Sequence, residues 1–178
     1  MGDFTLNRAK LESIGTSFEI ELANYVRAKL PAAHIIHNAQ IFSKQLGKMT
    51  QVDLTYISDK AVIVIEAKNW VDYIKGNCDD IEWQGRSRAH INMTVFNPVE
   101  QNNIHIRALR NALRLTGMNP PLFYNLVVLP DNTSIKSDCN EVINKSSLVK
   151  RIHEIELRSK HELNIGIIEK AIREVCTI

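Results

Sequence analysis

One short apolar run limits what this chain can fold into more than any other part of its sequence. Residues 61–65 read Ala-Val-Ile-Val-Ile and contain no polar side chain. A continuous apolar run of this length is typical of a strand that is covered on both faces of a sheet. Glu66 and Lys68 follow it directly, where charges without a purpose are costly to bury. The run therefore predicts a central strand that ends in two charged side chains.

A second strand is expected directly before this one. Residues 51–57 alternate between polar and apolar side chains, and residues 58–59, Ser-Asp, are typical of a tight turn. The two strands therefore form a hairpin, which brings Asp53 beside Glu66. Because side chains alternate along a strand, Glu66 and Lys68 project to the same side.

The grouping of Asp53, Glu66 and Lys68 is typical of phosphodiester hydrolysis. Two adjacent carboxylates repel each other unless a cation lies between them, and oxygen ligands favour a hard cation such as Mg²⁺ or Mn²⁺. A lysine beside that cation can orient the attacking water and stabilise charge on the phosphate. On these three residues alone, a solvated salt bridge at a strand end is the more ordinary interpretation, so the hypothesis depends on further residues of the same site.

The remaining pattern predicts an α/β fold. Helices are expected at about residues 14–30, 97–116, 146–156 and 160–175, further strands at 34–42, 122–129 and 141–143, and a loop with short extended pieces at 69–96. Asn97 can cap the second helix, Pro98 suits its first position, and Glu100 stands where a capping box places a carboxylate. The order of elements indicates a mixed central β-sheet flanked by helices, in one domain that spans residues 1–178.

Two polar residues interrupt the apolar faces of the predicted helices. Glu19 lies on the apolar face of the first helix, and Gln101 lies on that of the second helix, one turn after its start. Each can be the frayed end of an apolar stripe. Because both are aimed at the sheet, we expect them at the rim of the site that holds Asp53, Glu66 and Lys68.

Several motifs of this chain follow the order that they have in a known nuclease family. They are Gly15 with Phe18-Glu19, Gln51-Val52-Asp53, Val64-Ile65-Glu66-Ala67-Lys68-Asn69-Trp70, Ile74-Lys75-Gly76, Trp83, Asn97-Pro98-Val99-Glu100-Gln101-Asn102 with His105 and Leu109, and Leu126-Val127-Val128-Leu129. The chain resembles the NERD (nuclease-related) domain, a branch of the PD-(D/E)xK superfamily, over about residues 15–130. Phe18 stands where that family often has a second glycine. The resemblance implies a restriction-endonuclease-like core, with residues 131–178 as a C-terminal helical extension.

The resemblance also implies a metal-dependent nuclease that hydrolyses the phosphodiester bonds of DNA, as an endonuclease or an exonuclease. The implied site residues are Glu19, Asp53, Glu66, Lys68 and Gln101. We expect Mg²⁺, with Mn²⁺ as a substitute, to be held by Asp53, Glu66 and the main-chain carbonyl of Ala67. The alternative is a catalytically weak or inactive nucleic-acid-binding or adaptor module on the same fold. An RNA substrate, the strandedness of the DNA and a homodimer stay open, and a separate helicase or other DNA-processing protein is a candidate partner.

Four further residues are candidates for contacts with nucleic acid. Lys48 lies in a predicted turn, Arg86 and Arg88 lie in a loop with one tryptophan, and His105 lies in the second helix. The alternatives are a packed tryptophan with solvated arginines, and a histidine that packs on the sheet. The net charge is only +2, so any basic footprint must be local.

Scattered cysteines and the lack of long apolar runs indicate the cellular setting. Cys78, Cys139 and Cys176 show no metal-ligand spacing, so we expect reduced thiols rather than a disulfide framework or a structural zinc site. No apolar run reaches membrane-spanning length, and the N-terminus lacks the apolar core of a signal peptide. We therefore expect a cytoplasmic protein without membrane contact.

Overall fold

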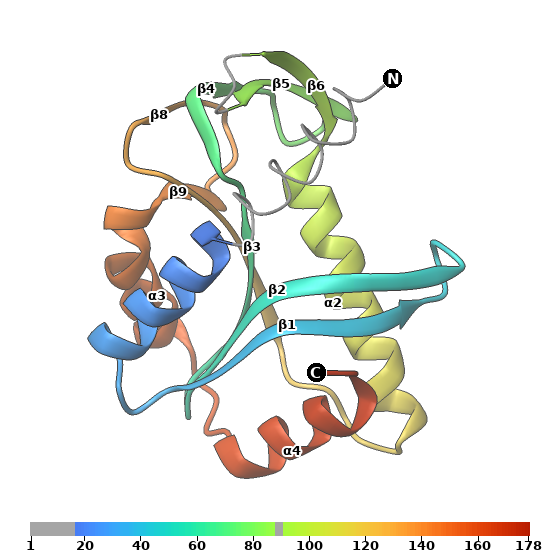
Figure 1. Cartoon of the computed structure of the whole chain (residues 1–178). Helices are drawn as coiled ribbons and strands as arrows, with labels where there is room; N and C mark the ends of the chain where they lie inside the picture. The colour runs from blue at the N-terminus through green and yellow to red at the C-terminus, as the bar shows by residue number, and fades with distance from the viewer. Residues whose placement is uncertain (1–16, 88–90) are drawn as a thin grey trace.

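A five-stranded mixed sheet lies at the centre of the protein (Figure 1). The structure is a computed structural model that describes residues 17–87 and 91–178. The strand order is β1-β2-β3-β7-β9, with bounds His34–Ser43 for β1, Lys48–Ile57 for β2, Val62–Ala67 for β3, Phe123–Leu129 for β7 and Val142–Asn144 for β9. The first three strands pair antiparallel, whereas β3, β7 and β9 pair parallel. The predicted α/β fold with a mixed central sheet is confirmed.

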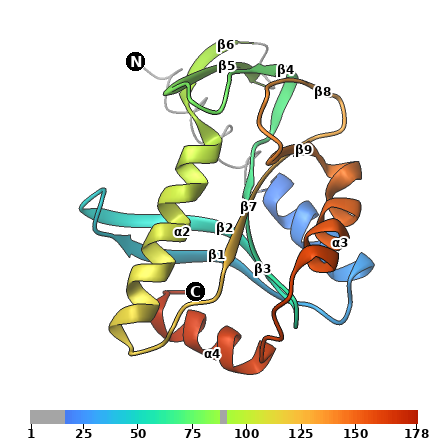
Figure 2. The same ribbon diagram turned by 180° about the vertical axis from the view of Figure 1, so that it is seen from behind.

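Helices cover both faces of this sheet (Figures 1 and 2). They are the first helix (residues 17–29), α2 (Pro98–Leu115), α3 (Leu148–Arg158) after a short 3-10 helix η1 (Lys145–Ser147), and α4 (Ile165–Val175). The first helix and α3 pack with Ile63 and Ile65 of β3, while α2 and α4 pack with Val62 and Val64. Alternate residues of the apolar run thus enter two separate cores, as a doubly covered strand requires. None of the helices in the described ranges is long and apolar enough to cross a membrane.

A second, smaller sheet occupies the segment that we expected to be a loop. β4 (Trp70–Lys75), β5 (Glu82–Ser87) and β6 (Asn92–Phe96) pair antiparallel, and β8 (Thr133–Lys136) joins β4 in parallel, in the order β6-β5-β4-β8. A Cβ atom at Gly76 would lie 2.3 Å from Cγ of the fully buried Trp83, so only glycine leaves room for that ring. The loop prediction was wrong here because the glycine that breaks the pattern makes space for an aromatic core.

The start of α2 is fixed by Asn97. Its side-chain oxygen accepts hydrogen bonds from the main-chain N–H groups of Val99 at 2.9 Å and Glu100 at 3.2 Å, which confirms the predicted cap. The predicted capping box does not form, because the Glu100 carboxylate binds the Arg107 guanidinium at 2.5 Å instead. The main-chain N–H of Asn97 donates to the carbonyl of Ile81, which ties the helix start to the segment between β4 and β5.

A disulfide joins the segment between β4 and β5 to the segment after β8. The sulfur atoms of Cys78 and Cys139 lie 2.13 Å apart, although the residues are 61 positions apart in sequence. The prediction of reduced thiols is therefore wrong for this pair, because spacing along a chain does not show which segments fold together. Cys176 is a free thiol, and burial raises its pKa to about 11.

Candidate active site

The paired part of β2 and β3 ends just before the two predicted carboxylates. Leu54 and Ile65 are the last residues paired at that end of the hairpin. Asp53 and Glu66 come next, and here Oδ2 of Asp53 accepts a 2.9 Å hydrogen bond from the main-chain N–H of Ala67. The exposed fractions of Asp53 and Glu66 are 8% and 2%. The end of the β2–β3 pairing, in the middle of β2 and near the end of β3, thus holds two buried carboxylates near one another.

Lys68 and Gln101 close a ring of contacts with Glu66. The Lys68 ammonium lies 2.6 Å from Oε1 of Glu66 and donates to Oε1 of Gln101 at 3.0 Å. The amide nitrogen of Gln101 donates to the same Glu66 oxygen at 2.7 Å. The other Glu66 oxygen lies 3.3 Å from Nε2 of His105, whose Nδ1 shares a 3.0 Å hydrogen bond with Thr50. Both oxygens of the Glu66 carboxylate therefore have a polar nitrogen close to them.

Helix α2 carries Gln101 and His105 to this position because it is anchored twice. The side-chain amide of Asn97 donates to two main-chain carbonyls between β4 and β5, at 3.0 and 2.8 Å. Asn102 is fully buried and donates to main-chain oxygens of β3 and β7, at 2.8 and 3.1 Å. The Asn-Pro-x-x-Gln-Asn segment was noticed in the sequence, but the docking role of Asn102 was not predicted from it.

Glu19 reaches the cluster through Gln51. The Gln51 amide nitrogen lies 3.4 Å from Oε2 of Glu19 and 3.4 Å from Oδ1 of Asp53. Glu19 comes from the first helix and is half-buried, so it lies at the edge of the cluster. Gln51 belongs to a motif that the sequence shares with the family, but it was not predicted to be a site residue. Its position two residues before Asp53, on the same side of β2, is the signal that could have found it.

The carboxyl groups of the cluster outnumber the cationic side chain Lys68. Burial, followed by the charges of Glu66 and Glu19, raises the pKa of Asp53 well above its usual value. Burial and the charge of Glu66 likewise raise the pKa of Glu19. Burial also opposes ionisation of Glu66, but Lys68 and His105 hold its pKa below the usual value. An oxygen-rich site with a surplus of carboxyl groups fits a hard divalent cation.

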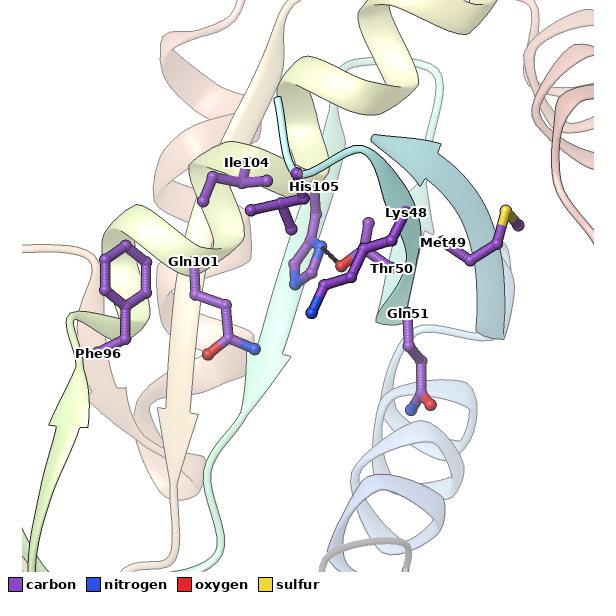
Figure 3. A pocket seen from close by; sticks show the side chains of 9 residues that line it. Lys48, Met49, Thr50, Gln51, Phe96, Gln101, Ile104 and His105 are labelled. Atoms are coloured by element: carbon purple, nitrogen blue, oxygen red, sulfur yellow. Dashed lines mark hydrogen bonds between the residues drawn. The ribbon is translucent and has the colours of Figure 1, made fainter. Parts of the chain in front are cut away.

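A cavity of about 450 Å³ lies beside this cluster (Figure 3). Gln101 and His105 belong to its lining, together with Lys48, Thr50 and Phe96. Lys48, a predicted contact with nucleic acid, is thus brought next to the cluster. His105, another predicted contact, is only 2% exposed and contributes little of its surface to the cavity.

The two arginines predicted to contact nucleic acid have different outcomes. Arg86 lies on β5, where its guanidinium is 3.2 Å from the Asp72 carboxylate. Arg88 lies outside the described residues. The small sheet therefore carries one of these arginines, next to an acidic side chain.

The mixed sheet with helices on both faces is consistent with a nuclease-like fold. The family model of the nuclease-related domain matches residues 14–130, and the chain belongs to this family, as the resemblance implied. One relative is an uncharacterized protein of Bacillus anthracis, which is 32% identical over 77 residues, or 43% of this chain and 35% of that protein. The chain thus matches about a third of the length of that relative. No solved structure matches the chain.

Proposed function

We propose that this protein is a metal-dependent nuclease that hydrolyses the phosphodiester bonds of DNA. The observation that carries the proposal is the position of Lys68, whose partly buried side chain contacts Glu66 and Gln101 where the β2–β3 pairing ends beside Asp53. A buried ion pair contributes little to stability, because desolvation offsets the attraction between the charges. A lysine that lies with two carboxylates where the β2–β3 pairing ends therefore supports a chemical role rather than a packing role.

Asp53, Glu66 and the main-chain carbonyl of Ala67 would hold Mg²⁺, for which Mn²⁺ could substitute. All these donors are oxygen atoms, which hard cations prefer. A divalent ion held by these oxygens would supply Lewis-acid stabilisation of phosphate charge and would lower the pKa of a bound water. The raised pKa of Asp53, caused by burial and the nearby carboxylates, supports this assignment, because a cation relieves that repulsion.

Lys68 acts on the substrate, whereas Gln101 holds Lys68 and Glu66 in position. Although burial opposes the charge of Lys68, the Glu66 carboxylate raises its pKa, so the ammonium stays protonated. It can therefore orient the attacking water and stabilise the charge that develops on the phosphate. Gln101 accepts from Lys68 and donates to Glu66, so one amide positions both side chains. Glu19 supports the rim of the site through Gln51.

One observation favours the alternative of a nucleic-acid-binding or adaptor module without useful turnover. Both oxygens of Glu66 already have contacts with Lys68, Gln101 or His105, so a metal ion must compete with them. A module that binds no metal would keep this arrangement permanently. DNA rather than RNA as substrate and a separate helicase or other DNA-processing partner belong to the same proposal and rest on the family and the sequence. A cytoplasmic location is also proposed, and it rests on the lack of long apolar runs in the sequence, because the Cys78–Cys139 disulfide removes the argument from reduced thiols.

A nuclease assay with linear, circular and single-stranded DNA tests the proposal. The wild-type protein should cut in Mg²⁺ or Mn²⁺ and should not cut in a chelator. Asp53→Asn should abolish cleavage. Asp59→Asn is the matched control, because Asp59 is an exposed aspartate that follows β2 on the same hairpin, and this variant should cut as fast as wild type. A wild-type protein that binds DNA but never cuts in any metal supports the binding module instead.

A further inference from the structure

The cavity beside the cluster has walls that the proposed cleavage chemistry does not use (Figure 3). Its volume of about 450 Å³ is in the range of sites that bind small organic molecules. Gln101 and His105 line it and also contact the carboxylate of Glu66. A molecule in the cavity therefore lies one side chain away from the proposed catalytic residues.

An aromatic ring and an amino group stand at different sides of this cavity. Phe96, the last residue of β6, is 43% exposed although it lines a concave site. Lys48 extends from β2 toward Gln101 (Figure 3). Within the part of the chain that the structure describes, the Lys48 ammonium has no salt bridge and no hydrogen bond. The cavity therefore offers a stacking surface and a cation that forms no salt bridge with any carboxylate of the described residues.

The rest of the lining mixes apolar and amide side chains. Leu46 and Ile104 supply apolar surface, and the amides of Gln51 and Gln101 supply hydrogen-bond donors and acceptors. A purely apolar ligand would leave these amides without partners, and a free anion would leave the aromatic ring unused. A ligand with a flat apolar face, a polar edge and an attached anion uses all of these groups.

We propose that this cavity binds an unstacked nucleobase of the nucleic-acid substrate, and this inference rests on the proposed function. Phe96 stacks on the base, because aromatic side chains stack on bases of any sequence. Lys48 contacts a neighbouring phosphate, whose negative charge a lysine neutralises. The amide of Gln101 lies between the base and the cluster that contains Lys68.

A cavity that binds an unstacked base selects nucleic acid that contains unpaired nucleotides. A base inside a duplex is stacked between its neighbours, so it cannot enter a side-chain cavity until it is unpaired and turned out. The protein should therefore prefer single-stranded DNA, an unpaired end or a mismatched nucleotide over an intact duplex. This preference arises from binding, so it can be measured without cleavage.

Binding of short single-stranded DNA with one abasic position tests the proposal. The affinity is measured in Ca²⁺ to block turnover, while the abasic position is moved along the strand. One position should weaken binding roughly five- to hundredfold, the loss expected for one stacked base. Phe96→Ala should weaken binding of the intact strand by a similar factor. In that variant the abasic position should cause no further loss, because both changes remove the same contact.

Phe42→Ala is the matched control. Phe42 is 54% exposed, lies on β1 and does not line the cavity, so this variant should bind as wild type does. Phe96→Tyr keeps the ring and should retain the wild-type affinity, which separates loss of stacking from loss of folding. Lys48→Ala should weaken binding to intact and abasic strands alike and reduce the slope of log affinity against log salt by about 0.7.

The outcomes separate this inference from the proposed function. An abasic effect that persists in Phe96→Ala, or no sensitive position at all, overturns the base-binding cavity even if the protein cleaves DNA. A sensitive position that disappears in Phe96→Ala supports the cavity even if no metal gives cleavage, in which case only the nuclease function fails. A wild-type protein that binds no nucleic acid overturns both.

Discussion

Neighbouring residues of α2 enter two buried polar clusters of different character. Gln101 enters the charged cluster and donates to Glu66 at 2.7 Å. Asn102 enters a neutral cluster, where it donates to the side-chain oxygen of Asn125 at 2.7 Å and to main-chain oxygens of β3 and β7. The neutral cluster buries amides that join α2 to the sheet, whereas the charged cluster buries ionisable groups.

The two clusters have opposite effects on the stability of the fold. Hydrogen bonds from buried amides to strand carbonyls stabilise the packing of a helix on a sheet. Buried carboxyl groups repel one another, and the raised pKa values of Asp53 and Glu19, caused by burial and by neighbouring carboxylates, report that cost. The neutral cluster is therefore explained by folding, whereas the charged cluster needs another reason to exist.

Lys68→Ala should separate the two clusters most strongly. Cleavage should fall about a hundredfold or more, because one preorganised electrostatic group is lost from the transition state. Metal affinity should stay nearly intact, since lysine is not a ligand, and DNA affinity in Ca²⁺ should weaken only modestly. The measurements are a metal titration, DNA binding and cleavage, made in parallel.

Lys150→Ala, at a lysine that is 82% exposed on α3, is the control. Cleavage by Lys68→Ala at the wild-type rate would show that Lys68 is not catalytic.

Asn102→Ala should lower the stability of the fold rather than act on the chemistry of the charged cluster. It removes the donor from buried main-chain oxygens, so the free energy of unfolding should fall by about 2 kcal/mol. Urea unfolding measures this loss, and Asn111→Ala, at an exposed position of the same helix, should change stability little. If Asn102→Ala were as stable as the control, the neutral cluster would not be what docks α2 on the sheet.

Asp53→Asn should have the smallest effect on the fold. Without metal, the variant should be as stable as wild type or slightly more stable, because a buried carboxyl group that others repel becomes neutral. Added Mg²⁺ should raise the Tm of wild type but not of the variant, since a ligand stabilises only the state that binds it. Thermal unfolding in chelator and in Mg²⁺ gives both values. A large loss of Tm in chelator would make Asp53 a structural residue and would weaken the contrast with Asn102.

The central sheet could be predicted because a strand that is buried on both faces has a continuous apolar sequence. The apolar run of β3 supplies alternate residues to two cores, and no polar residue interrupts it. The strands of the small sheet contain no such apolar run. A Cβ atom at Gly85 of β5 would lie 2.6 Å from Cε3 of Trp70, so the glycine makes room for a ring on the neighbouring strand. In a sequence the same glycine indicates a break rather than a paired strand.

In the candidate site, too, some positions follow from local sequence patterns, whereas others depend on how distant segments pack together. Glu66 and Lys68 could be paired in advance, because the alternation of a strand places them on one side. Gln101 was visible as a polar residue on an apolar helix face. The Gln51 bridge and the approach of His105 to Glu66 depend on how two helices pack on the sheet. The sequence could place Gln51 on the Asp53 side of β2, but no local pattern contains the packing of the helices, so the contacts themselves could not be predicted.

The cap at Asn97 also sets the rotational phase of α2. Successive residues of an α-helix are turned by about 100° around its axis. The distance along the chain from Asn97 to Gln101 therefore decides which side chain faces Glu66. One residue inserted or deleted in that interval would turn Gln101 and Asn102 by the same angle, and both would miss their clusters. The length of this interval therefore constrains the site, whichever residues fill the positions between Asn97 and Gln101.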